Sequence, residues 1–425
     1  MNRWPLRPLA ALATDARGSI TDGPFGSHLT SAHYTETGPQ VVRLQNIGDG
    51  VYRRAEAHIS EEHFETLRKH EVLPGDLLLA SLGEVLPRAC LMPDDIGPAI
   101  VKADCIRIRL RDDVDARWVM YSMQRPVIRK WADDLLHGVG RPRLGLGVIR
   151  RIPVPLPALD EQRRIVDILE DHLSRLDAAD ASLRGARHNA GRLRSMALAR
   201  VWRDGLRQGR LQTIDSIAAG GLFVDGDWVE SKDQDPAGTV RLTQLADVGI
   251  GEFRDRSDRW MREDQASRLH CTFLLPRDVL IARMPDPLGR ACLAPNSIGR
   301  AVTAVDVAIL RPHDDSLLPE FVMLLLNSPQ AHDRMTALQS GTTRKRISRK
   351  NLGSIRVPIP SIEAQQGAID SYRTIEDSLA TLQAALDTLA ARSTSLRRAL
   401  LTAAFSGRLT GRSSDLDIAE ELMPT

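Results

Sequence analysis

Two short basic segments have the residue types best suited to bind a charged partner. Residues 138–143 read GVGRPR, and residues 341–346 read GTTRKR. Arg and Lys neutralise phosphate groups, and glycine lets a backbone approach a ligand closely. A basic run is usually only a solvated surface, but two runs at matching places favour DNA contact. The residues predicted to contact DNA here are Arg141, Arg143, Thr342, Thr343, Arg344, Lys345 and Arg346.

A turn near the start of the chain offers backbone groups for the same chemistry. Residues 22–27 read DGPFGS, which places Gly23, Gly26 and Ser27 in a tight turn. Its glycines can bring N–H groups up to a phosphate. An ordinary surface turn explains the same pattern equally well.

Polar side chains able to read DNA bases lie along the predicted strand at residues 40–47. Arg can bond both acceptors of a guanine edge, and Asn or Gln can bond both polar atoms of an adenine edge. Alternation along a strand explains such residues without DNA, so both interpretations stay open. The candidates are Arg43, Gln45 and Asn46, with Arg241 and Gln244 in the second half.

The sequence contains no set of residues with catalytic spacing. A DNA methyltransferase needs a glycine-rich turn for its cofactor and an Asn/Asp-Pro-Pro-aromatic motif for a flipped base. The Gly-Xaa-Gly fragments at 138–140 and 249–251 are isolated, and no Pro-Pro-aromatic tripeptide exists. Residues 230–232, ESK, match a nuclease fragment without its upstream Pro-Asp, and the His and Glu residues of 58–63 fit no standard metal spacing. We therefore predict no catalytic, cofactor-binding or metal-binding residues.

The sequence repeats itself about 203 residues apart. VPLP at 154–157 returns as VPIP at 357–360, and RACL at 88–91 returns at 290–293. A duplicated chain of this length is expected to fold as two similar domain-sized modules related by a pseudo-two-fold axis. Double-stranded DNA, which also has approximate two-fold symmetry, is the commonest partner for such an arrangement.

Composition indicates a globular cytoplasmic protein. Of the 425 residues, 42% are hydrophobic and 26% are charged, and the net charge of +2 argues neither for nor against nucleic acid. The four cysteines have no CxxC spacing and are typical of buried apolar residues in a reducing compartment. The longest strongly apolar run, residues 321–326, is too short to span a bilayer, so we expect no membrane association.

Each half of the chain combines a mixed globular part with a long helix. Short apolar runs broken by Gly and Pro predict strands and turns, and a cluster of prolines then precedes a helical pattern. We predict an α+β fold with a pseudo-two-fold internal repeat. Its parts are two mixed α/β domains at 1–158 and 207–360, long helices at 159–206 and 361–410, and a tail at 411–425.

Apolar residues in the two long helices recur at alternating steps of three and four, the pattern of a coiled coil. Separate surface helices are the alternative, but matched register and length favour mutual pairing. Two-fold symmetry makes the pair antiparallel, and about 40 residues give a spacer of roughly 60 Å. The predicted seam residues are Ile165, Leu169, Leu176, Leu183, Leu193, Ile375, Leu379, Leu382, Leu386, Leu389, Leu396 and Leu400.

These features together resemble the specificity subunit of type I restriction-modification systems. The resemblance covers essentially the whole chain and rests on the duplicated order of globular part and coil. Its motifs are IPVPLPALDEQ at 152–162, GTTRKRIS at 341–348, and the end of the second helix, from LRR at 396–398 to FSGRL at 405–409. No single motif is decisive, but their order and duplication are specific.

The resemblance implies two target-recognition domains, each reading one half of an asymmetric, interrupted DNA sequence. It also implies that the coils dock two methyltransferase subunits, which carry S-adenosylmethionine and methylate adenine, and that a translocating restriction subunit can join them. Two departures are visible: Ala364 stands where the first helix has Glu161, and the GPFGS turn has no counterpart near 220–227. Both indicate domains that differ in detail.

Two other functions stay open at this point. A stand-alone DNA methyltransferase or nuclease would act without partners, and a coiled-coil scaffold would bind protein rather than DNA. The recognised bases, the length of the unread gap and the presence of a restriction subunit are not readable from the sequence.

Overall fold

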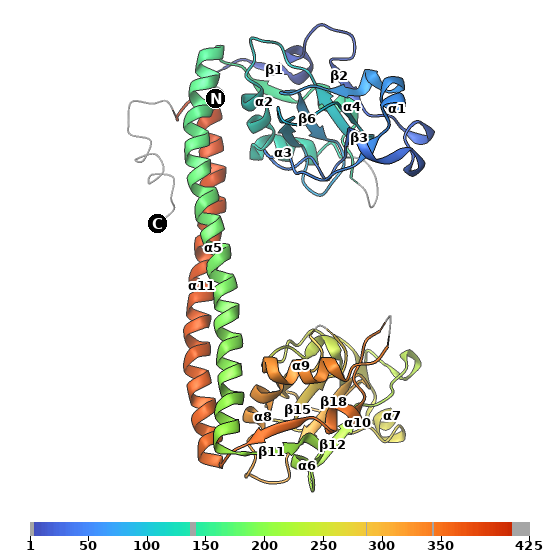
Figure 1. Cartoon of the computed structure of the whole chain (residues 1–425), viewed down its shortest axis with the longest axis vertical. Coiled ribbons are helices and arrows are strands. Elements are labelled where there is room, and N and C mark those ends of the chain that lie inside the picture. The colour runs from blue at the N-terminus through green and yellow to red at the C-terminus, as the bar shows by residue number, and fades with distance from the viewer. Residues whose placement is uncertain (1–3, 137–141, 286, 342–343, 410–425) are drawn as a thin grey trace. The chain divides into compact units, whose positions relative to one another are not determined.

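The computed structural model describes residues 4–136, 142–285, 287–341 and 344–409. The chain divides into two compact units. Unit 1 comprises residues 1–183 and 388–425, and unit 2 comprises residues 184–387. The division falls inside the two long helices, α5 (Leu159–Gln208) and α11 (Ile362–Ser406), so each unit contains a globular part and a portion of both helices (Figure 1).

The globular part of unit 1 contains two four-stranded sheets and a short ribbon. One sheet has the order β2 (Ile20–Asp22), β9 (Cys105–Ile108), β6 (Leu77–Ala80), β7 (Arg88–Leu91). The other has the order β4 (His58–Ile59), β3 (Tyr34–Val42), β8 (Ala99–Val101), β5 (Glu71–Val72). The ribbon pairs β1 (Leu6–Pro8) with β10 (Pro153–Pro155), and the helices are α1 (Glu61–Thr66), α2 (Ala116–Met123), α3 (Pro126–Asp133) and α4 (Leu146–Arg150).

The globular part of unit 2 repeats this plan. Its four-stranded sheet has the order β12 (Leu222–Asp225), β18 (Val307–Arg311), β15 (Val279–Ala282), β16 (Ala291–Leu293). Its second sheet has the order β14 (Trp260–Met261), β13 (Val240–Thr243), β17 (Ala301–Thr303), and β11 (Arg210–Thr213) pairs with β19 (Arg356–Ile359). The helices are α6 (Ile214–Ile217), α7 (Glu263–Arg268), α8 (Pro319–Leu326), α9 (Pro329–Ala337) and α10 (Arg349–Gly353). The duplication seen in the sequence is therefore a duplication of topology.

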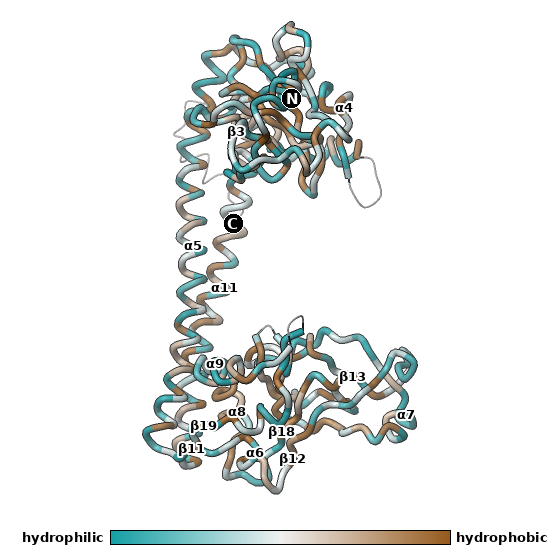
Figure 2. The backbone as a smooth tube through the Cα atoms, turned by 45° about the vertical axis from the view of Figure 1, so that its right-hand side comes forward, coloured by the Kyte–Doolittle hydropathy of each residue, from teal (hydrophilic) through white to brown (hydrophobic). Residues whose placement is uncertain are grey.

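The inner strands of both large sheets are apolar along their whole length. Every residue of β6 and of β15 is buried, because other elements cover both faces of these sheets. Figure 2 shows the hydrophobic segments concentrated in the globular parts, at strands such as β13 and β18. One ion pair with a buried carboxylate recurs beside these strands: Asp76 bonds the partly exposed Arg109 in unit 1, and Asp278 bonds the partly exposed Arg311 in unit 2.

The long helices pair in antiparallel fashion within each unit. In unit 2, Arg187 bonds Asp387 at 2.6 Å and Arg194 bonds Glu376, so partner numbers fall as helix numbers rise. In unit 1, Arg397 of α11 bonds Asp177 of α5. The paired helices confirm the predicted α+β architecture with an antiparallel coil.

The helix seam is narrower than the heptad pattern predicts. Ile165, Leu169, Leu379, Leu386 and Leu400 are buried, and Leu176, Leu183, Ile375 and Leu396 are half-buried. Leu193, Leu382 and Leu389 are instead 51%, 38% and 47% exposed, which corrects their assignment to the seam. An α-helix drifts by about 20° per heptad relative to a strict seven-residue repeat, so some heptad positions turn to the margin of the contact, where water reaches them. Within the described ranges, no helix is both long enough and apolar enough to cross a membrane.

Candidate nucleic-acid interface

A cavity of about 550 Å³ lies at the strand ends of unit 1. The loop after β3 contributes Arg43 and Gln45, the loop after β6 contributes Glu84, and the turn between β8 and β9 contributes Lys102 and Asp104. The cavity therefore combines cationic, anionic and amide groups. That mixture suits the donors and acceptors of base edges as well as phosphates.

The loop that carries Arg43 is held by a buried asparagine. Asn46 is fully buried, its Oδ1 accepts from the Arg43 backbone N–H at 2.8 Å, and its Nδ2 donates to the carbonyls of Arg53 and Ala55. This corrects the prediction that Asn46 contacts DNA, because its side chain is committed to backbone groups. Arg43 is half-buried, and its Nη2 donates to the Glu56 carbonyl at 3.0 Å, while Gln45 is exposed.

The DGPFGS turn is shaped by packing at its first glycine. A Cβ on Gly23 would lie 2.1 Å from the carbonyl carbon of Lys102, and the Gly23 N–H donates to Asp22 Oδ1 at 2.8 Å. Gly23 is thus needed for close backbone approach, and its N–H is not available to a phosphate, which corrects that prediction. Gly26, with φ of +62°, and Ser27 are exposed.

Arg143 lies among carboxylates. Its guanidinium lies 2.8 Å from Asp104 and 3.5 Å from Asp22, and it stacks over Phe25 with its central carbon 5.3 Å from the ring centroid. Burial raises the pKa of Asp22 above its usual value. Arg143 borders the turn of residues 22–27 through Asp22 and Phe25, and it is still partly exposed. Arg141 lies outside the described residues.

In unit 2, the predicted Arg241 is engaged inside the protein. It forms ion pairs with Asp255 and, at 3.5 Å, with the buried Asp247, and it stacks over Phe253. Its side chain is only 14% exposed. The structure therefore corrects the assignment of Arg241 to the DNA surface. The sequence could not show this, since the carboxylates come from a loop of unpredicted conformation.

The structural counterpart of Arg43 is Gln244, not Arg241. The Arg43 N–H donates to Asn46 Oδ1, and the Gln244 N–H donates to Asp247 Oδ2 at 2.7 Å in the same kind of turn. In the parallel strand pairs, Gln40 lies opposite Ala99 just as Arg241 lies opposite Ala301. The two units thus hold an arginine and a glutamine at one equivalent position.

The basic segment of unit 2 is a hairpin with an open surface. Ser340 and Arg346 exchange backbone hydrogen bonds of 2.8 and 2.9 Å across its base. Arg344, Lys345 and Arg346 are exposed, and within the described residues no acidic side chain forms an ion pair with them. Thr342 and Thr343 lie outside the described residues.

Sequence reasoning missed three polar residues of the unit 1 cavity. Glu84, Lys102 and Asp104 lie in loops that follow or precede buried strands. Lys102 Nζ donates to the Tyr34 hydroxyl at 2.9 Å, which holds the lysine at the cavity wall. Their position at strand ends was the available signal, because loops held by buried strands often carry binding residues.

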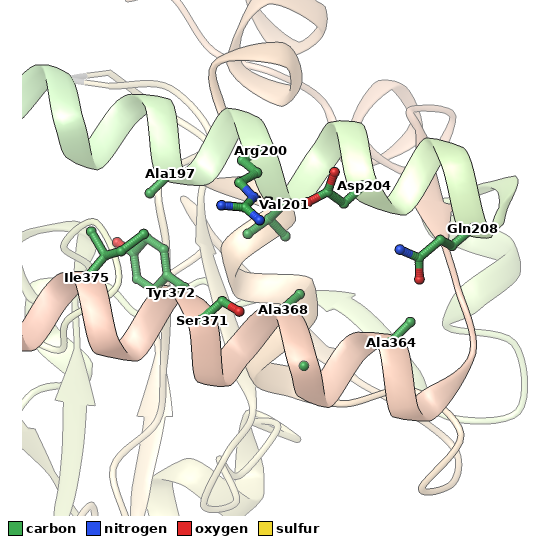
Figure 3. Close-up of a pocket in the computed structure, with 11 residues that line it drawn as sticks. Ala197, Arg200, Val201, Asp204, Gln208, Ala364, Ala368, Ser371, Tyr372 and Ile375 are labelled. Carbon is green, nitrogen blue, oxygen red and sulfur yellow. Dashed lines mark hydrogen bonds and ion pairs between the residues drawn. The ribbon is translucent and has the colours of Figure 1, made fainter.

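A second hollow of about 320 Å³ lies between α5 and α11 in unit 2 (Figure 3). Small residues of α11, among them Ala364, Ala368 and Ser371, face Arg200 and Asp204 of α5. The small side chains of α11 leave space between the two helices. On the α5 side of that space, Arg200 and Asp204 bond each other at 3.2 Å. The hollow offers a polar groove between two helices.

Comparisons with known proteins agree on one family. A family model for the type I restriction modification DNA specificity domain matches residues 50–180. The type I restriction enzyme EcoBI specificity subunit of Escherichia coli is 21% identical over 412 residues, covering 87% of this chain and 85% of that protein. The type I restriction enzyme MjaVIII specificity subunit of Methanocaldococcus jannaschii is 21% identical over 156 residues, covering 36% of this chain and 37% of that protein.

Solved structures show the same fold. A chain from a study of complex assembly and conformational transition in a type I restriction-modification system superposes with a TM-score of 0.72 at 20% identity, covering 96% of this chain and 98% of that one. The HsdS subunit from Thermoanaerobacter tengcongensis gives a TM-score of 0.52 at 20% identity, with 96% and 97% coverage. The domain match, the curated relatives and the solved structures thus agree that this chain is similar to the specificity subunits of type I restriction-modification systems.

Proposed function

We propose that this chain is a DNA specificity subunit that reads a two-part, asymmetric DNA sequence, with one half-site contacted by each globular part. The observation that carries the proposal is the Arg43–Gln244 equivalence: the same kind of turn occurs in both units and holds side chains whose chemistry suits different bases. Identical side chains there would favour two identical half-sites. The exposed residues Arg344 and Arg346 of unit 2 would supply phosphate contacts.

We further propose that the long helices dock two methyltransferase subunits. Those subunits would bind S-adenosylmethionine and methylate adenine, and a restriction subunit can add cleavage. Leu193 and Met196, one turn apart on α5, are 51% and 60% exposed, and exposed apolar side chains of this size favour a partner surface. The groove of Figure 3 offers a second contact for such a partner.

The test is to express the chain with methyltransferase subunits of a type I system from the same genome and to sequence the methylated bases. We expect one interrupted adenine motif with two unlike halves, and no methylation when the chain is omitted. Methylation at sites without a shared motif, or a single uninterrupted motif, would contradict the proposal. Methylation by the purified chain alone would favour the stand-alone enzyme.

A further inference from the structure

Helices α3 of unit 1 and α9 of unit 2 occupy equivalent places, but the residues at their N-terminal ends differ. In unit 2, Asn327 bonds both the N–H and the carbonyl of Ala291, at 2.9 and 2.8 Å. Ser328 then caps α9, because its Oγ accepts from the Ala331 N–H. The side chains of Asn327 and Ser328 are therefore both hydrogen-bonded inside the unit.

In unit 1 the equivalent residues are Gln124 and Arg125, and their hydrogen bonds are incomplete. Both are 7% exposed. Among the described residues, Gln124 Nε2 and Arg125 Nη1 have no hydrogen-bond partner, and no side chain caps α3. Burial lowers the pKa of Arg125 to about 10, which still leaves it charged at neutral pH. A buried cation without an anionic partner is costly, and the guanidinium of Arg125 lies over the ring of Phe405, with its central carbon 5.2 Å from the ring centroid.

A cavity of about 370 Å³ opens beside this helix start, between α3 and α11. Gln124 and Pro126 line it at the N-terminus of α3, where the helix dipole is positive. Lys130 and Arg398 also line it, and both are exposed without an ion pair to any described residue. Asp49 and Asp133 are on the wall too, but Asp49 bonds Arg129.

The counterpart in unit 2 lacks this charge. Lys130 corresponds to Asp333, and Arg398 corresponds to Ser195, at the same offset of 203 residues. Two positions that hold cations in unit 1 therefore hold an anion and a neutral residue in unit 2. The positive cavity is a property of unit 1 and not of the shared fold.

We propose that the cavity between α3 and α11 binds one phosphate group of the DNA backbone. The inference rests on the proposed function and adds an anchoring contact that carries no base information. The loop of residues 43–50 links it to the reading cavity: Arg43 and Gln45 line that cavity, and Asp49 lines this one. A helix N-terminus flanked by Lys and Arg is a common phosphate site.

The experiment uses the full chain assembled with its methyltransferase subunits and DNA carrying its methylated motif. The variant Lys130→Ala/Arg398→Ala is compared with Arg7→Ala/Arg17→Ala, which removes two exposed charges of unit 1 outside the long helices. We expect the first variant to lower the slope of log affinity against log salt by about 1, equally on specific and non-specific DNA. The second variant should keep the wild-type slope.

A second arm replaces single phosphates along the target with neutral methylphosphonates. One position should weaken binding by the wild type and have no further effect on Lys130→Ala/Arg398→Ala, as coupled groups do. An unchanged salt slope with intact DNA binding overturns the phosphate site and leaves the proposed function standing. Loss of methyltransferase assembly with an unchanged slope also overturns it and assigns the cavity to an acidic protein surface. Absence of DNA binding by the wild-type assembly overturns the proposed function itself.

Discussion

Gln162 and Gln365, which stand 203 residues apart, make the same hydrogen bonds in the two units. Gln162 Oε1 accepts from the Asp115 N–H and its Nε2 donates to the Pro157 carbonyl, both at 2.9 Å. Gln365 Oε1 accepts from the Leu318 N–H at 2.9 Å and its Nε2 donates to the Pro360 carbonyl at 3.1 Å. Each buried amide therefore fastens a long helix to the globular part beside it.

Replacing either glutamine should loosen that junction. Gln365→Ala leaves the half-buried Leu318 N–H without its acceptor, which costs about 1–3 kcal/mol of unfolding free energy. Urea denaturation of the full chain measures this loss. Gln366→Ala, at the exposed neighbour, should change stability by less than about 0.5 kcal/mol. Equal stabilities for the two variants would show that the buried bonds contribute nothing to the junction.

Exchanging the equivalent reading residues should change the recognised bases. Arg43→Gln removes the side chain suited to guanine and supplies one suited to adenine, and Gln244→Arg does the reverse. Each variant should lose about 1–3 kcal/mol of affinity for the native half-site, read as a changed base in the methylated motif. Arg17→Gln, at an exposed position, is the charge-matched control and should leave the motif unchanged. A native motif in both exchange variants would remove the pair from the reading surface.

The hairpin of unit 2 should bind phosphates without regard to sequence. Arg344→Ala/Arg346→Ala is expected to weaken specific and non-specific DNA binding alike and to reduce the salt slope by about 1 for each phosphate that the variant no longer neutralises. Titrations at several salt concentrations test this, with Arg203→Ala on exposed α5 as control. Affinity equal to the wild type at every salt concentration would contradict the assignment.

If the helices act as a spacer, their length should set the unread gap. Seven residues inserted into both α5 and α11 preserve the heptad register and add about 10 Å, because each helical residue rises about 1.5 Å. The gap between the methylated half-sites should grow by about three base pairs, since B-DNA rises about 3.4 Å per base pair. A gap of unchanged length, with methylation retained, would exclude the spacer role.

Acid should destabilise unit 2 through His332. Burial lowers the pKa of His332 below its usual value of 6.5, and its buried Nε2 has no hydrogen-bond partner within the described residues. The unfolded chain then binds a proton more readily than the folded one, so stability falls as pH drops below about 6.5. Urea midpoints at pH 7.5 and 5 should differ less for His332→Gln than for wild type or for His188→Gln. Identical pH dependence in all three proteins would contradict this role.

Much of the architecture follows from local patterns that the sequence alone contains. Prolines before 159 and 362, heptad spacing after them and the repeated VPLP and RACL segments predict two mixed domains and two paired helices. These features are periodic or steric and act over a few residues, so they can be interpreted without knowing which distant residues come into contact.

The reading surface was decided only by tertiary contacts. Asn46 and Arg241 have the chemistry to bond DNA, but distant backbone carbonyls and carboxylates engage them inside the protein. The Arg43–Gln244 equivalence emerges only from strand register, which sets Gln40 opposite Ala99 in unit 1 and Arg241 opposite Ala301 in unit 2. Which polar side chains turn outward depends on the partners that the folded chain brings to them, and those partners lie far away along the sequence.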